Sequence, residues 1–408
     1  MNEEEDVPPA EVLDALWAAL KDNYPAFEFV VGATGDAWRD EFRARLVGVP
    51  ALSDAYPVLE ELVNRFHDYH TQMHWPDKPS RRSPAGVRLG WVEGVVAVVT
   101  AAPLPAARLM PGDVLLAIDG EDVDRLYQRQ LAIARGATHY ARRSWACDSL
   151  LEGNAGTTVG VRVQRGADGS RKTLELECVR AMPSPRESLD FLRSSADSVE
   201  VRRVSADVGY IRIPSWQPLS EVNFLARFDA ALEEFQNLPF LLLDVRDNRG
   251  GSDALADQVT GRFLRAPIVS SISFHREAGT QRYQKTVEIA HPRGPWRYAG
   301  RAAVLTNEDC ASACEHFVSG MRASGAALLV GRPTTGACGW LKPIPLPGGS
   351  VLYCSLTFPF HGAEPSPLHG IEPDRLVLPT LAALRAGRDL VIEEAVASLR
   401  SGDAMEET

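Results

Sequence analysis

A serine between a predicted strand and a predicted helix is the first residue that could do chemistry. Ser312 follows the apolar run 302–306 and precedes the helical pattern 313–323, so its hydroxyl would lie at the positive end of a helix. Several hydrolases present a nucleophile on such a turn, and the next backbone amide stabilises the oxyanion. An N-cap serine is a commoner reason for a serine at such a position. Ser312 alone therefore leaves both interpretations open.

A second candidate follows another buried strand, where residues 240–245 lead into the sequence D-V-R-D-N-R-G-G at 244–251. The adjacent glycines Gly250 and Gly251 would let the backbone approach a ligand closely and direct amide groups at an anion. A tight strand-to-helix turn, in which the acidic and basic residues of the loop pair with each other, explains the same sequence. Taken alone, this loop does not decide between an anion site and a structural turn.

Three histidines, His67, His70 and His74, lie in one short segment. On a continuous helix they would lie near one face, which would suit a metal ion. No fourth ligand is evident nearby, and the Trp75-Pro76 pair indicates that a helix ends there. The cysteines downstream have spacings that match no common zinc pattern. We therefore expect neither a metal ion nor another cofactor.

Composition excludes several classes of protein. The chain has 408 residues, of which 45% are hydrophobic and 24% charged, as in globular proteins. A net charge of −11 argues against nucleic-acid binding, and no apolar run approaches the roughly 18 residues that span a bilayer. The acidic N-terminus does not resemble a secretory signal, and six irregularly spaced cysteines suit reduced thiols. We therefore expect a cytoplasmic protein without nucleic-acid or membrane partners.

The elements that must position these residues change character twice along the chain. Residues 1–80 carry apolar stripes with helical spacing. Residues 85–181 contain short alternating segments, which predict strands and a hairpin, together with one helical stretch at 121–151. From 186 to 398 strands and helices alternate, which predicts an α/β domain with a mostly parallel sheet. We therefore place three domains, at 1–80, 85–181 and 186–398.

Taken in order, these segments resemble the tail-specific, or C-terminal processing, serine protease family, and within it the tricorn core and chlamydial protease-like branch. The resemblance rests on the D-x-H-T sequence at 68–71, the P-G-D-V-L-L-A-I-D-G sequence within 109–120, and the segments 244–251, 311–315, 330–336 and 369–374. It implies an α/β core of the ClpP/crotonase-like type with an inserted PDZ-like, β-rich domain and an N-terminal helical region. The PDZ-like domain would bind peptide.

The resemblance also implies a nucleophile and an oxyanion hole. Ser312 occupies the position of the family's nucleophilic serine. The amides of Ala313 and of Gly251, or alternatively Gly250, would then stabilise the tetrahedral oxyanion. A serine hydroxyl is scarcely ionised at neutral pH, so Ser312 needs a general base.

The expected base is a histidine, because the lysine of the tail-specific branch is replaced here by Ala337. The tricorn-like branch uses the histidine of the D-x-H-T sequence, which corresponds to His70. A histidine near pKa ~6.5 needs little tuning, whereas a lysine such as Lys342 would have to titrate far below ~10.4. For the carboxylate that orients His70, the resemblance points to Glu364, with Glu372 as the alternative.

These expectations combine into one function. The chain is expected to be a serine endopeptidase that hydrolyses peptide bonds of peptide or protein substrates by a Ser–His(–Glu) mechanism without a cofactor. Because the usual lysine is missing, the alternative is a catalytically inactive relative that only binds peptides.

Overall fold

The computed structural model describes most of the chain. The described residues are 7–32, 35–76, 81–84, 86–101, 109–167, 169–180, 199–218, 220–277, 280, 282–337, 339–359 and 369–402. None of the helices in these ranges is long and apolar enough to cross a membrane.

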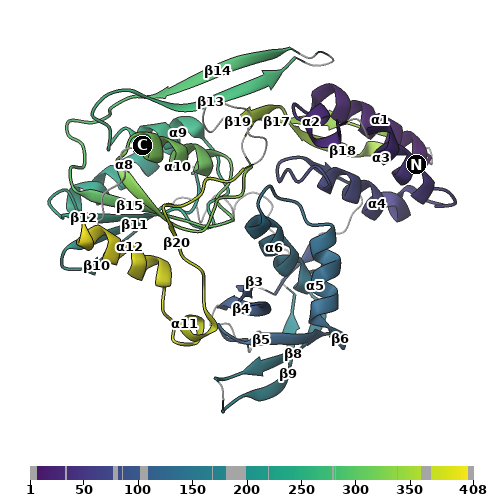
Figure 1. The fold of residues 1–408 in the computed structure, drawn as a ribbon, viewed down its shortest axis with the longest axis horizontal. Helices are drawn as coiled ribbons and strands as arrows, with labels where there is room; N and C mark the ends of the chain where they lie inside the picture. Colours follow the sequence, from purple (N-terminus) through teal and green to yellow (C-terminus); the bar gives the residue numbers. More distant parts are fainter. Residues whose placement is uncertain are drawn as a thin grey trace.

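A six-stranded sheet in the order β10-β11-β12-β15-β16-β20 forms the largest unit (Figure 1). The strands are β10 (Glu200–Ser205), β11 (Val208–Arg212), β12 (Phe240–Asp244), β15 (Arg301–Thr306), β16 (Ala327–Gly331) and β20 (Arg375–Leu376). Every neighbouring pair is parallel except β10–β11. The predicted α/β core with a mostly parallel sheet is therefore confirmed.

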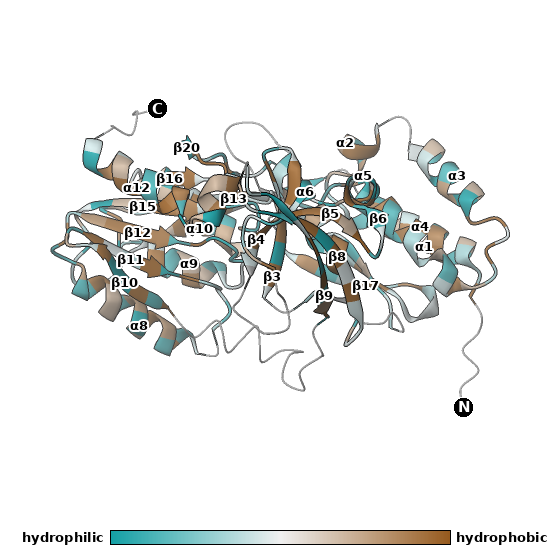
Figure 2. Ribbon diagram, turned by 90° about the horizontal axis from the view of Figure 1, so that it is seen from below, coloured by the Kyte–Doolittle hydropathy of each residue, from teal (hydrophilic) through white to brown (hydrophobic). Residues whose placement is uncertain are grey.

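Helices cover both faces of this sheet, because a parallel sheet must bury both. The helices are α8 (Glu221–Glu234), α9 (Asp253–Thr260) and α10 (Ala313–Ala323) on one face and α12 (Leu390–Ser401) on the other. Leu241 and Leu243 of β12 pack toward the first group, whereas Leu242 packs toward α12. Figure 2 shows the resulting apolar strands between helices of mixed hydropathy.

A long hairpin covers α9 and α10 on one side of the core. It consists of β13 (Ile268–Arg276) and β14 (Tyr283–Ala290), and the short β19 (Thr357–Pro359) pairs with β13. β13 contacts α10 and β14 contacts α9, and the hairpin extends along the top of the molecule in Figure 1. This arrangement encloses the space between the two helices and the hairpin.

The N-terminal helices share their core with strands from the other end of the chain. These helices are α1 (Pro9–Asn23), α2 (Phe27–Val31), α3 (Gly35–Arg45) and α4 (Leu52–Asn64). They pack against Leu346, Leu352 and Cys354 in and beside β17 (Leu341–Pro345) and β18 (Val351–Ser355). β1 (Gln72–His74) pairs with β18. Residues 1–80 therefore share one core with part of the 186–398 segment, whereas residues 87–178 have a core of their own.

The region after the N-terminal helices is rich in strands and lies at the bottom of Figure 1. Its sheet contains β3 (Val87–Val92), β4 (Val95–Ala101), β5 (Val114–Ile118), β6 (Glu121–Asp122), β8 (Thr158–Arg165) and β9 (Lys172–Val179). The predicted hairpin is β8–β9. The single helical stretch predicted at 121–151 is wrong, because α5 (Val123–Ala132) and α6 (His139–Asp148) are separate helices. Gly136, with φ 123°, lies in the turn between them.

Candidate active site

Ser312 adopts a backbone conformation that few non-glycine residues tolerate. It precedes α10 with φ 58° and ψ −128°, and its hydroxyl does not cap the helix. Its amide donates a hydrogen bond to the carbonyl of Ala337 at 2.6 Å, and its carbonyl accepts one from His316 at 3.1 Å. Such strain persists only where the surroundings enforce it, and it is concentrated at functional sites. The N-cap interpretation of Ser312 is therefore wrong.

The buried carboxylate of Glu315 holds the loop that fixes Ser312. It accepts hydrogen bonds from the amides of Gly336 and Ala337, each at 2.7 Å, and from the hydroxyl of Thr334. Since Ala337 is also the acceptor for the Ser312 amide, the carboxylate indirectly sets the position of the nucleophile. Acceptors that bind backbone amides in a buried site are costly to remove.

The glycine pair lies against Ser312. A Cβ at Gly250 would lie 2.6 Å from the Cβ of Ser312, so no side chain could be accommodated there. The amide of Gly250 already donates to Asn248 Oδ1 at 2.9 Å, which disfavours it as an oxyanion donor. The structure shows no such bond from the amides of Gly251 and Ala313 to another described residue. These two amides are therefore the better donors for an oxyanion.

The other polar residues of the D-V-R-D-N-R-G-G loop form ion pairs and hydrogen bonds that hold the loop in place. Arg246 pairs with the buried Asp244 at 2.6 Å and with Asp389 at 2.8 Å. Asn248 donates to the carbonyl of Ile213 at 2.9 Å, and its own carbonyl accepts from Ala311 at 3.1 Å. The glycine loop and the nucleophile loop are thereby tied together. The structural-turn interpretation therefore holds for Asp244 and Arg246, whereas the anion site at the glycines stays a prediction.

His70 lies in a loop that Asp68 organises. The carboxylate of Asp68 accepts from the amide of His70 at 2.9 Å and from the hydroxyl of Thr71 at 2.7 Å. The Thr71 hydroxyl in turn accepts from the amide of Ser355 at 3.2 Å, which fixes the loop to β18. α4 ends at Asn64 and His74 lies in β1. The histidines therefore share no helical face.

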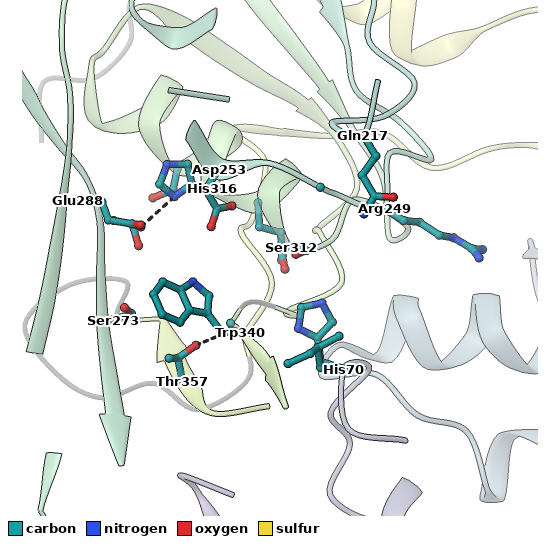
Figure 3. Close-up of a pocket in the computed structure, with 16 residues that line it drawn as sticks. His70, Gln217, Arg249, Asp253, Ser273, Glu288, Ser312, His316, Trp340 and Thr357 are labelled. Carbon is teal, nitrogen blue, oxygen red and sulfur yellow. Dashed lines mark hydrogen bonds and ion pairs between the residues drawn. The ribbon is translucent and has the colours of Figure 1, made fainter. Parts of the chain in front are cut away.

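His70 and Ser312 line the same cavity, which has a volume of about 480 Å³. Figure 3 shows the imidazole beside the serine side chain, at the side of the cavity formed by the N-terminal region. Burial lowers the pKa of His70 below its usual value, while the charge of Asp68 acts in the opposite direction. Nδ1 of His70 is buried and has no hydrogen-bond partner among the described residues.

The remaining candidates for base and orienting carboxylate lie elsewhere. Glu364 falls outside the described residues. Glu372 is exposed, its backbone carbonyl accepts from Arg322, and it does not line the cavity of His70 and Ser312. Lys342 also lies off the cavity, and its Nζ donates to Asn23 Oδ1 at 3.1 Å.

The cysteines nearest to Ser312 are not exposed to substrate. Cys310 and Cys314 are fully buried, and their thiols point at the carbonyl of Val245, at 3.1 and 3.6 Å. Burial raises the pKa of Cys310. A buried thiol with a raised pKa is a poor nucleophile. Cys338 lies outside the described residues.

The cavity is also lined by three ionisable residues that were not among the residues predicted from the sequence. They are Asp253 on α9, Glu288 on β14 and His316 on α10. His316 follows Ser312 by four residues in a predicted helix, so helical periodicity could have placed both on one face. Nothing in the local sequence could have brought Glu288 to them, because it reaches the cavity from the distant hairpin.

One family model, curated relatives and solved structures are similar to this chain. The model of peptidase family S41 matches residues 207–377. The chain is 25% identical to carboxyl-terminal-processing peptidase 1 (chloroplastic) of Arabidopsis thaliana over 392 residues, covering 87% of this chain and 71% of that protein. The solved structure of mature CPAF complexed with lactacystin matches with a TM-score of 0.77 and 15% identity, covering 97% of this chain and 99% of the other. The photosystem II D1 C-terminal processing protease matches with a TM-score of 0.51 and 20% identity over 94% of this chain and 98% of the other.

Proposed function

We propose that this chain is a serine endopeptidase of peptidase family S41, whose model matches residues 207–377, and that Ser312 is its nucleophile and His70 its general base. The observation that carries this assignment is the strained Ser312, which lines one cavity together with the half-buried His70. Two relatives of the chain in Arabidopsis thaliana are carboxyl-terminal-processing peptidases, so we propose that this chain cuts near the carboxyl end of a protein substrate.

The proposed reaction begins when the Ser312 hydroxyl attacks the scissile carbonyl as its proton passes to His70. The amides of Gly251 and Ala313 then hold the oxyanion of the tetrahedral intermediate. The leaving amine takes the proton back from His70, and an acyl-enzyme remains. A water molecule that loses its proton to the same imidazole hydrolyses the acyl-enzyme and restores Ser312.

Two charged groups would assist the base. Asp68 supplies negative charge close to His70 while its oxygens are engaged by the backbone and by Thr71. Glu364 remains our proposal for a carboxylate that contacts the ring. Two observations support it: Nδ1 of His70 lacks a described partner, and Thr357, which lines the cavity, precedes Glu364 by only seven residues.

A fluorophosphonate probe tests the assignment of the nucleophile. We expect stoichiometric labelling of the wild-type chain at Ser312, located by mass spectrometry, and no labelling of Ser312→Ala. Iodoacetamide should leave the hydrolysis of denatured casein unchanged, because Cys310 and Cys314 are buried. Inactivation by iodoacetamide together with resistance to the phosphonate would instead assign a cysteine nucleophile.

We also propose that residues 85–181 form a PDZ-like domain that captures an extended peptide by strand addition. Its support is that β3 is an edge strand of the sheet, with β4 as its single neighbour in the strand order. A cytoplasmic location is likewise proposed. All five described cysteines are free, and reduced thiols persist in reducing compartments.

A further inference from the structure

One end of the active-site cavity has an excess of negative charge. Asp253, Glu288 and His316 line it, and their nitrogen and oxygen ligand atoms lie within 4.8 Å of one another. Nε2 of His316 lies 2.8 Å from Asp257 Oδ1, and its Nδ1 lies 3.5 Å from Glu288 Oε2. Three carboxylates thus surround one imidazole. Even a protonated imidazole offsets only one of the three negative charges.

The described residues that line the cavity supply little positive charge to offset this excess. Among the described lining residues the other basic group besides the histidines is Arg249, which pairs with Asp309 at 3.6 Å. Burial raises the pKa of Asp253 and of Glu288 above their usual values. Burial alone would lower the pKa of His316, but the hydrogen bond and charge of Asp257 raise it overall. A cation from outside would relieve this repulsion.

The position of these residues relative to Ser312 indicates which part of a substrate they would contact. Asp253 follows Gly251 by two residues, and His316 lies about 6 Å along α10 from Ser312. Figure 3 shows His70 on one side of Ser312 and the cluster on the other. The leaving amine must lie near His70, which returns its proton. The residue that supplies the scissile carbonyl therefore extends toward the cluster.

We propose that Asp253, Glu288 and His316, with Asp257 behind them, form a subsite that selects lysine or arginine at the residue that supplies the scissile carbonyl. This inference rests on the proposed function. An ammonium or guanidinium group offers several N–H donors, and the carboxylates of Asp253 and Glu288 accept them. The hydroxyls of Ser271 and Ser273 line the same cavity and add neutral acceptors. Since the cluster lies inside the substrate cavity, the substrate's own cation is favoured over a resident metal ion.

The experiment compares cleavage sites and affinities for matched peptides. The wild-type chain digests denatured casein and a random peptide library, and mass spectrometry identifies the residue before each cut. Peptides that differ only in lysine, norleucine or glutamate at that residue then give kcat/KM. We expect lysine to exceed norleucine by roughly 10- to 100-fold, as for hydrogen bonds to charged groups, and glutamate to be cleaved least. EDTA should leave the ranking unchanged.

The variants Asp253→Asn and Glu288→Gln should each reduce the ratio of kcat/KM for lysine peptides to kcat/KM for norleucine peptides by about tenfold. Glu277→Gln, which removes a carboxylate elsewhere on the hairpin, is the matched control and should change nothing. Melting temperatures of all three variants verify folding. In the Ser312→Ala background, fluorescence anisotropy of labelled lysine and norleucine peptides measures the same preference without turnover.

The outcomes separate the two proposals. Absence of any cleavage would refute the proposed function, while a preference for lysine in binding would still support the subsite. Cleavage and binding without a charge preference would refute the subsite alone. If calorimetry shows one Zn²⁺ bound per chain, lost in Asp253→Asn, and EDTA alters the ranking, then a metal site replaces the subsite we propose.

Discussion

The backbone amide of His70 donates a hydrogen bond to the carboxylate of Asp68 at 2.9 Å, so this carboxylate influences the base by its charge rather than by a bond to the ring. Burial lowers the pKa of His70 and Asp68 opposes that effect. Since the neutral imidazole is the active form, kcat/KM should fall as the pH drops through this pKa. The midpoint should lie below the ~6.5 of an unperturbed histidine.

Asp68→Asn should move that midpoint to lower pH, because the substitution removes the charge that favours the protonated imidazole. The asparagine oxygen can still accept from the His70 amide, which preserves the loop. The measurement is a pH profile of kcat/KM for both proteins with one peptide. A midpoint that stays in place or rises in the variant would show that Asp68 does not tune His70.

His70→Ala and Ser312→Ala should lose similar amounts of activity, roughly 10⁴- to 10⁶-fold, because members of one catalytic unit are not additive. The double variant should lose little more than either single variant. Lys342→Ala should stay within about twofold of wild type, as for a surface substitution, since its Nζ contacts Asn23 and not the cavity. An essential lysine with a dispensable His70 would assign the base to Lys342.

Glu315→Gln should destabilise the fold by about 2–4 kcal/mol and lower kcat. The glutamine amide group cannot accept from all three of Thr334, Gly336 and Ala337, whose donors the carboxylate satisfies. Urea denaturation gives the stability, and turnover of casein gives the activity. The exposed Glu233→Gln on α8 is the control and should be neutral in both. Normal turnover by a destabilised Glu315→Gln would mean that Ser312 does not depend on this loop.

Local sequence was enough to place Ser312 and the helix that follows it. The pattern 313–323 coincides with α10, because strong amphipathic periodicity and a preceding buried strand leave few alternatives. The strand predicted at 240–245 coincides with β12 to within one residue for the same reason. The parallel sheet follows from this alternation.

Contacts between segments that are distant in the sequence could not be predicted from local sequence patterns. β1 pairs with β18, almost three hundred residues later, and this pairing brings the His70 loop to the core. Gly250 and Gly251 look equivalent in sequence, but Asn248 engages the amide of only the first. Glu288 reaches the cavity because the β13–β14 hairpin packs against α9 and α10. Hydrophobic periodicity predicts the helix or strand that carries a residue. It does not predict which distant helix or strand packs against it.

Arg88 joins the β-rich region to both catalytic loops. Its guanidinium lies 2.5 Å from Asp247, 2.5 Å from Asp309 and 3.3 Å from Asp148. Asp247 precedes the glycine pair and Asp309 precedes Ser312, whereas Asp148 ends α6. Burial raises the pKa of Asp148 to about 6, against the opposing charge of Arg88. Arg88 therefore contacts three carboxylates at the junction, where Arg212 and Arg249 lie further away, each at 3.6 Å from Asp247 and Asp309 respectively.

Arg88→Met should destabilise the chain by about 2–4 kcal/mol at pH 8 and reduce kcat, because the carboxylates that flank the two loops would repel each other. Without Arg88 the pKa of Asp148 should rise further. A carboxyl whose folded-state pKa is raised costs stability above that pKa and recovers it on protonation. The difference in Tm between the variant and wild type should therefore be smaller at pH 5 than at pH 8. Arg162→Met, which removes an exposed pair with Glu175 on the same sheet, should show neither effect. A Tm difference that is equal at both pH values, or larger at pH 5, would mean that Arg88 acts by packing and not by compensating charge.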